Sequence, residues 1–221
     1  MVPVLSFLET RVLGVLAEKE RTVPDTYPLT LNALVAGCNQ KTSRDPATNA
    51  PETEVQAALD RLKSMTFVIE SSGGRVARYS HNIERVLQIP KQSAALLTVL
   101  MLRGPQTAGE LRINSERLHS FTDIDLVELF LRELAERAAG ALVAELPRQA
   151  GSRENRWMHL LSGASAAQDV AAHVSVPVID AGGVAVSELA AVKADVARLQ
   201  AEVSALKVLL DQVCSELGIR R

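Results

Sequence analysis

"RVARYSH" at residues 75–81 and "RENRWMH" at residues 153–159 follow one pattern, Arg-x-x-Arg-aromatic-x-His. The aromatic residue is Tyr79 in the first copy and Trp157 in the second, although the chain has only one Trp and two Tyr. A rare residue type that recurs at the same place in a motif indicates an internal duplication, in which each copy belongs to one structural unit.

The sequence before the first copy predicts three helices. Apolar residues spaced three and four apart predict a helix from about residue 5, begun by a capping box formed by Ser6 and Glu9. Thr30 is the expected cap of a second helix, and a third follows Pro51. "FVIESS" at 67–72 and "RVARYSH" then read as the two strands of a hairpin around Gly73 and Gly74.

The sequence before the second copy repeats this order. Helices are expected over 94–104, after a cap at Thr107, and over 124–137, followed by strands at 141–147 and 156–162. Three helices followed by a hairpin is the order of a winged helix. The sequence therefore predicts a mainly α fold with small β-hairpins: two tandem winged-helix domains, residues 1–85 and 86–162, each with its own small core.

The rest of the chain is of a different kind. Residues 163–183 are small, weakly charged and aperiodic, which is typical of a linker, and residues 184–221 are expected to form a coiled-coil helix. The apolar residues there repeat with a heptad period and predict dimerisation through Leu189, Val192, Val196, Leu199, Val203, Leu206, Leu210, Val213 and Leu217. The alternative is a long amphipathic helix that packs on its own domains.

Composition narrows the class of protein. Two cysteines far apart, Cys38 and Cys214, predict no disulfide framework. The N-terminus lacks the features of a signal peptide, and no apolar run is long enough to span a membrane. We therefore expect a cytoplasmic homodimer with no membrane partner.

Several stretches resemble the YceH-like family of bacterial tandem winged-helix proteins. The resemblance covers nearly the whole chain and includes "YPLTLNAL" at 27–34, "CNQKTSR" at 38–44, "RGPQTAGELR" at 103–112 and "LPRQAGSRENRWMHLL" at 146–161. It implies two winged-helix domains and a coiled-coil tail. It implies no established biochemical activity.

The first hypothesis for function is a dimeric DNA-binding protein, a transcriptional regulator that uses its first winged helix on double-stranded DNA. Turn residues before the third helix and arginines of the hairpin are suited to phosphates, and polar residues of the third helix can reach base edges. The candidate DNA-binding residues are Lys41, Ser43, Arg44, Gln56, Arg61, Arg75 and Arg78.

Charge argues against this hypothesis and keeps a second one open. Residues 1–82 hold nine Lys and Arg against nine Asp and Glu, so the excess positive charge that drives DNA binding is missing. The third helix of the second unit is acidic, with Asp125, Glu128, Glu133 and Glu136. The alternative is a protein-interaction or scaffold module. A face of mixed charge, in place of a continuous positive one, favours this alternative.

No motif for catalysis is found. The sequence has no phosphate-cradling Gly-rich loop, no nucleophile elbow and no closely spaced set of metal ligands. We expect no catalytic residues, no metal site, no cofactor and a protein that is not an enzyme. His81 and His159 are expected to be structural, and Cys38 a buried, inert thiol.

Overall fold

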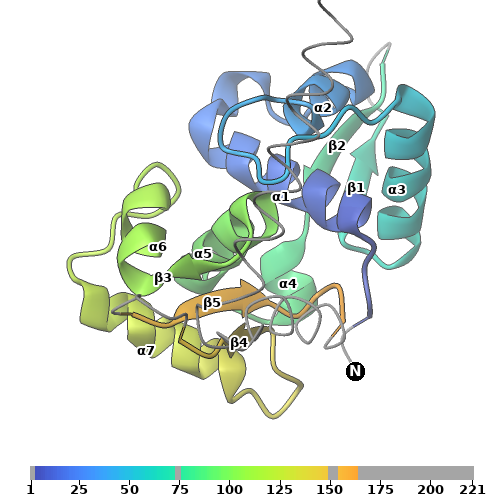
Figure 1. Ribbon diagram of the computed structural model, residues 1–221. Helices are drawn as coiled ribbons and strands as arrows, with labels where there is room; N and C mark the ends of the chain where they lie inside the picture. The colour runs from blue at the N-terminus through green and yellow to red at the C-terminus, as the bar shows by residue number, and fades with distance from the viewer. Residues whose placement is uncertain (1–2, 73–75, 149–153, 164–221) are drawn as a thin grey trace, which may run out of the picture. The chain divides into compact units, whose positions relative to one another are not determined.

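The computed structural model describes residues 3–72, 76–148 and 154–163 (Figure 1). In this part the chain is mainly helical with short antiparallel hairpins, which confirms the expected class at that level. The linker, the heptad residues 189–217, Arg75 and the hairpin glycines lie outside the described residues, and the predictions made for them stay predictions. No described helix is long and apolar enough to cross a membrane.

The first half combines helices with one hairpin. Its described elements are α1 (Phe7–Thr22), the 3-10 turn η1 (Pro24–Thr26), α2 (Leu31–Cys38), α3 (Glu52–Ser64), β1 (Val68–Ser71), β2 (Arg78–His81) and α4 (Ile83–Leu87). Helix α1 begins with the predicted capping box, because the Ser6 hydroxyl accepts from the backbone of Glu9 and the Glu9 carboxylate accepts from the backbone of Ser6. Thr30 caps α2 as expected. The short helix α4 is an addition to the expected order.

The second half repeats the order with one added strand. Its described elements are α5 (Lys91–Arg103), β3 (Gln106–Thr107), α6 (Ala108–Asn114), α7 (Ile124–Ala135), β4 (Val143–Glu145) and β5 (Arg156–His159). Thr107 caps α6 as predicted, in a capping box with Glu110. Strand β3 pairs with β5 to give a three-stranded sheet of order β3-β5-β4.

The two copies of the aromatic motif occupy matching places in the two halves. Tyr79 lies opposite Glu70 in one hairpin, and Trp157 lies opposite Glu145 in the other. On its second edge each aromatic residue pairs with the residue before a helix cap, Tyr79 with Leu29 and Trp157 with Gln106. Both aromatic side chains are buried, so the duplication predicted from the two stretches is visible in strand register as well as in sequence.

The buried side chains form one continuous cluster that runs through both halves. Helices α1 and α5 lie side by side at its centre (Figure 1). Gly14 allows their close approach, because a Cβ atom there would lie 2.9 Å from Leu102 Cδ2. The structure thus differs from the expectation of two separate small cores, because the buried faces of α1 and α5 cover each other. The expected boundary between residues 85 and 86 falls inside α4.

Candidate interaction surfaces

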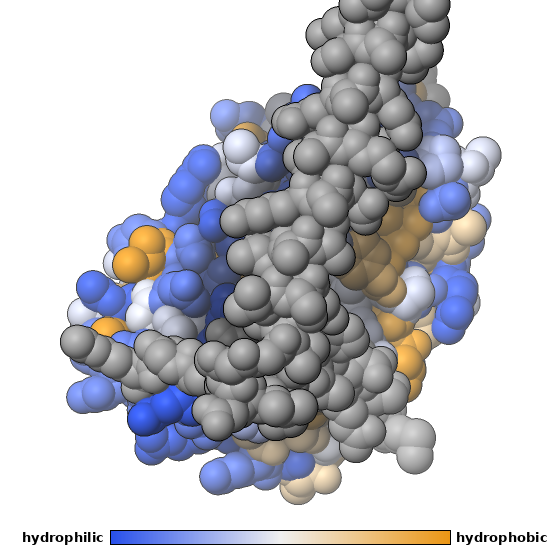
Figure 2. All heavy atoms as spheres, viewed as in Figure 1, coloured by the Kyte–Doolittle hydropathy of each residue, from blue (hydrophilic) through white to orange (hydrophobic). Residues whose placement is uncertain are grey.

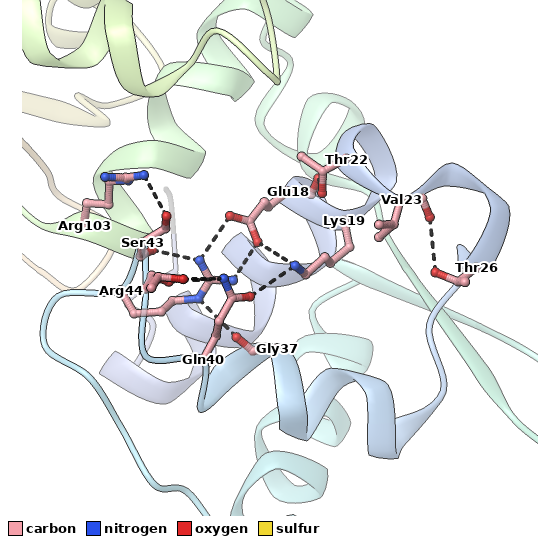
Figure 3. A network of polar contacts seen from close by, with 11 residues as sticks. Glu18, Lys19, Thr22, Val23, Thr26, Gly37, Gln40, Ser43, Arg44 and Arg103 are labelled. Atoms are coloured by element: carbon pink, nitrogen blue, oxygen red, sulfur yellow. Dashed lines mark hydrogen bonds and ion pairs between the residues drawn. The ribbon is translucent and has the colours of Figure 1, made fainter.

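Arg44 is a predicted phosphate contact, and its position is unsuited to that role. Its side chain is fully buried, and its guanidinium donates two hydrogen bonds to the Glu18 carboxylate, at 3.1 and 2.6 Å (Figure 3). Two further hydrogen bonds reach the carbonyl oxygens of Gly37 and Ser43. Burial opposes ionisation of Glu18, but the hydrogen bonds and charge of Arg44 outweigh it and hold the pKa of that carboxyl below its ordinary value. Arg44 fixes the turn after α2 onto α1.

The neighbouring turn residues differ in their exposure. The Ser43 hydroxyl accepts a hydrogen bond of 2.8 Å from Arg103 Nη2, which ties this turn to α5 (Figure 3). Lys41 is exposed. Among the described residues of the predicted DNA interface, Lys41 alone has no hydrogen bond or ion pair with another described residue. Its ammonium group is therefore free to meet a phosphate, as far as the described part of the chain goes.

The two predicted base-reading residues of α3 are bound to acidic neighbours. Gln56 Nε2 donates to Asp60 Oδ1 at 3.1 Å. Arg61 Nε lies 3.0 Å from Glu9 Oε1, the same carboxylate that caps α1. The N-terminal end of α3 adds two exposed glutamates, at positions 52 and 54. Because the N-terminal residues of a recognition helix approach the bases most closely, this end would repel DNA.

Arg78 lies on the exposed side of β2 and faces the loop before α2. Its Nη1 atom donates to the carbonyl oxygens of Thr26 at 3.3 Å and Pro28 at 2.8 Å. The outer face of α3 and its hairpin is thus a mixture of charges held by internal contacts. In the view of Figure 2, hydrophilic side chains cover most of the described surface, and apolar side chains gather in patches between them.

A groove that the sequence does not predict lies on the second half, between α7 and the hairpin of β4 and β5. Its volume is about 550 Å³. We call it the α7 groove. Four glutamates and two arginines line it, with Trp157 and two alanines as its apolar part: Glu128, Glu136, Glu145, Glu154, Arg132, Arg148, Ala108 and Ala135. Its lining is therefore acidic on balance.

The charges of the α7 groove are only partly satisfied by each other. Arg132 Nη2 donates to Glu128 Oε2 at 2.8 Å, one turn earlier on the same helix. Asn155 Nδ2 donates to Glu145 Oε1 at 2.7 Å, across the hairpin. The Glu136 carboxylate has no hydrogen bond or ion pair with another described residue. The groove therefore keeps negative charge available for a ligand.

The corresponding place in the first half differs from this groove at several positions, one of which carries a cation. In α3, Lys63 forms ion pairs with Glu70 of the hairpin and with Asp60, at 3.4 Å for the latter. The hydrogen bond to Glu70 raises the pKa of Lys63. This cation therefore bridges the third helix and the hairpin of the first half.

Alanine occupies the equivalent position in the second half. The matched leucines Leu62 and Leu134 are each followed directly by this position, which is Lys63 in α3 and Ala135 in α7. The alanine side chain is too short to bridge helix and hairpin, and Ala135 lines the α7 groove. The space beside the helix therefore stays open.

The sequence contains a signal for the α7 groove in the comparison of its two repeats. The acidic residues of the third helix in the second unit indicate a face that is unfavourable for DNA, but they do not indicate a groove. Glu145 and Glu154 reach the same place only because β4 and β5 pair beside α7. When the two repeats are aligned, the replacement of Lys63 by Ala135 is the feature of the sequence that indicates open space beside α7.

Cys38 is unsuited to nucleophilic catalysis. It is fully buried, and burial raises the pKa of its thiol to about 12, so it stays protonated at neutral pH. This confirms the buried thiol expected from the sequence. A different group of side chains in the described part of the chain, Glu20, His81 and Glu84, is placed so that it can hold a metal ion.

The fold and its surfaces define a duplicated helix-and-hairpin protein with charged outer faces. A family model described as "Protein of unknown function, DUF480" matches residues 5–152, and the chain belongs to this family. It is 56% identical over 214 residues to a UPF0502 protein of Dechloromonas aromatica, covering 94% of this chain and 95% of that relative. It is 57% identical over 219 residues to a UPF0502 protein of Burkholderia orbicola, covering 97% and 90%.

Proposed function

We propose that this chain is a non-enzymatic, cytoplasmic tandem winged-helix protein that docks a protein partner through the α7 groove. The order of three helices and a hairpin in each half supports the winged-helix assignment. The observation that carries the function is the groove itself, which lies where the third helix meets the hairpin and is acidic on balance. An acidic groove repels the phosphates of nucleic acid.

The occupant we propose is a basic, amphipathic segment of another protein. Four glutamates against two arginines in the lining give charge complementarity to Lys and Arg side chains. Trp157 and the two alanines offer an apolar floor for an aliphatic or aromatic side chain between those cations. Such a segment would lie along α7 and against β5.

Dimerisation through residues 189–217 remains part of the proposal. The heptad pattern of Leu and Val supports a two-stranded coiled coil, which would give each dimer two α7 grooves. Two grooves joined in one dimer would bind a partner with two basic segments more tightly than one groove alone.

The second candidate is DNA binding by the first half. The exposed Lys41 and the hairpin residue Arg78 favour it, because both lie on the surface of the first winged helix. Against it stand the burial of Arg44 and the internal pairing of Arg61. We therefore rank the protein partner first.

The single tryptophan makes the proposal testable with the full chain, because Trp157 lines the groove. A synthetic amphipathic peptide of Lys and Leu should change Trp157 fluorescence on titration, and the matching Glu and Leu peptide should not. The double variant Glu128→Lys with Glu136→Lys should weaken binding of the basic peptide by about tenfold or more. The control double variant Glu52→Lys with Glu54→Lys, on α3, should leave the affinity for the basic peptide unchanged.

A duplex DNA titration separates the two candidates. DNA binding that falls steeply with salt, and that Lys41→Ala weakens, would support the second candidate. Two outcomes would contradict the α7 groove as the docking site. One is that the chain binds the basic and the acidic peptide equally, and the other is that the two double variants bind the basic peptide equally.

A further inference from the structure

Glu20 meets His81 and Glu84, two residues far from it in sequence, where α1, β2 and α4 come together. His81 Nε2 lies 3.2 Å from Glu20 Oε2, and His81 Nδ1 lies 3.5 Å from Glu84 Oε2. The His81 side chain is 4% exposed, whereas the two glutamates remain open to solvent at 37% and 30%. A buried imidazole between two reachable carboxylates is a donor set that suits a divalent metal.

The spacing of these atoms is close to that of a metal site. One ligand atom from each residue can be chosen so that all three lie within 4.8 Å of one another. Tetrahedral zinc has bonds of about 2.0–2.2 Å to nitrogen and oxygen, which places two ligands roughly 3.3 Å apart. The 3.2 Å between His81 Nε2 and Glu20 Oε2 matches this separation. Glu84 Oε2 lies 3.5 Å from Nδ1, the other ring nitrogen, so the Glu84 side chain has to move toward Nε2 to become the third ligand.

The backbone holds the imidazole in place. The His81 amide donates to the Tyr27 hydroxyl at 2.8 Å, and the Tyr27 ring meets the imidazole edge-on. The Ile83 amide donates to His81 Nδ1 at 3.4 Å, so Nε2 carries the ring proton and faces Glu20. Zinc bound at Nε2 would displace this proton. A ligand whose orientation is fixed before binding loses little freedom when the metal arrives.

A small cavity lies beside the three residues. It measures about 20 Å³ and is lined by Glu20, His81 and Glu84 together with residues of α1 and α5. That volume is enough for one water molecule or one ion. Arg21 and Lys91 line it as well, and Arg21 lies 3.6 Å from Glu20, so a metal must compete with a cation already present.

The second half lacks the same ligands at the matching positions. His159 corresponds to His81, but Gly104 stands where α1 has Glu20, and Ser162 stands where α4 has Glu84. The two carboxylates are therefore not required by the shared backbone frame. We propose that Glu20, His81 and Glu84 form a zinc site at the junction of the two halves, with the fourth position open to the cavity.

The test is calorimetric titration of Zn²⁺ into the full chain after removal of metals with a chelator, followed by Co²⁺ absorption spectroscopy. We expect one Zn²⁺ per chain and Co²⁺ bands typical of low coordination number. His81→Gln, Glu20→Gln and Glu84→Gln should each lower the affinity by about tenfold or more. The matched control His159→Gln should leave it unchanged.

Two results would overturn the proposal. One is the absence of stoichiometric Zn²⁺ binding by the native chain. The other is binding that Glu20→Gln and Glu84→Gln leave intact, which would assign the metal to other residues. Both glutamates are partly exposed, so these variants test the site even where His81→Gln fails to fold.

Discussion

The two halves of the molecule share a backbone frame and differ in the chemistry placed on it. At the end of α1 the first half has Glu18 and Glu20, and the matching residues of the second half are Leu102 in α5 and Gly104 directly after it. Glu18 forms the buried ion pair with Arg44, whereas Leu102 is buried among apolar side chains. The first half is therefore held in part by charge, and the second at this place by apolar packing.

The two equivalent histidines show the same divergence. His81 lies between two carboxylates, whereas His159 lines an apolar groove of about 370 Å³ with Phe7, Met101 and Met158. His159 Nδ1 is buried and has no hydrogen-bond partner among the described residues. A duplicated fold thus keeps the position of a side chain and changes what surrounds it.

The largest effect is expected from the buried ion pair. Arg44→Met removes the buried guanidinium and leaves the partly buried Glu18 with Lys19 as its ion-pair partner, so it should lower the free energy of unfolding by about 3 kcal/mol. The double variant Glu18→Leu with Arg44→Met copies the apolar solution of the second half and should recover most of this loss. Urea unfolding at about pH 7.5 measures both, with Arg78→Ala as an exposed control. If the double variant is no more stable than Arg44→Met, apolar packing cannot replace the ion pair at this place, and the two halves are not equivalent there.

The next effect concerns His159 and pH. Burial lowers the pKa of His159 from 6.5 to about 4, so below pH 6.5 the unfolded chain binds this proton more tightly than the folded chain. The contribution of neutral His159 to the free energy of unfolding is therefore intact above pH 6.5 and is lost as the pH falls toward 4. Between about pH 7.5 and pH 5.0 the loss should be about 1–2 kcal/mol, after allowance for the partial exposure of the side chain.

Urea unfolding of the wild type and of His159→Met at the two pH values measures this contribution. The variant should lose less stability on acidification than the wild type, because Met cannot be protonated and suits the apolar groove. An equal loss in both proteins would mean that other groups account for the acid sensitivity.

The fold could be predicted from the sequence to a large extent because its signals are local. Helix caps such as Ser6, Thr30 and Thr107 act within a few residues, and the repeated aromatic motif predicts both hairpins. The contact between α1 and α5 could not be predicted, because an apolar helix face does not indicate which partner covers it. Helix α4 has only five residues, which is too short for a recognisable pattern.

The candidate sites were harder to predict, because they depend on contacts between distant residues. Arg44 and Lys41 lie in the same turn, and their residue types give no indication that one is buried against Glu18 and the other is exposed. Glu20 and His81 are separated in the chain by two helices and most of a hairpin. Only the packing of α1 against β2 brings them together.

The smallest effects come from exchanging the residues that close or open the space beside the third helix. Ala135→Lys places a cation opposite Glu145, as Lys63 lies opposite Glu70, and should close the α7 groove. Binding of the Lys and Leu peptide should fall by about tenfold, which corresponds to roughly 1.4 kcal/mol. Stability should change by no more than about 1 kcal/mol, since exposed ion pairs contribute little.

The reverse exchange, Lys63→Ala, opens the same space in the first half. It should cost at most about 1 kcal/mol of stability, because Lys63 is partly exposed. Peptide binding at the α7 groove, followed by Trp157 fluorescence, should stay at the wild-type level. If Ala135→Lys binds the peptide as well as the wild type does, the peptide does not bind in the open space beside α7. The difference between Lys63 and Ala135 would then have no consequence for docking.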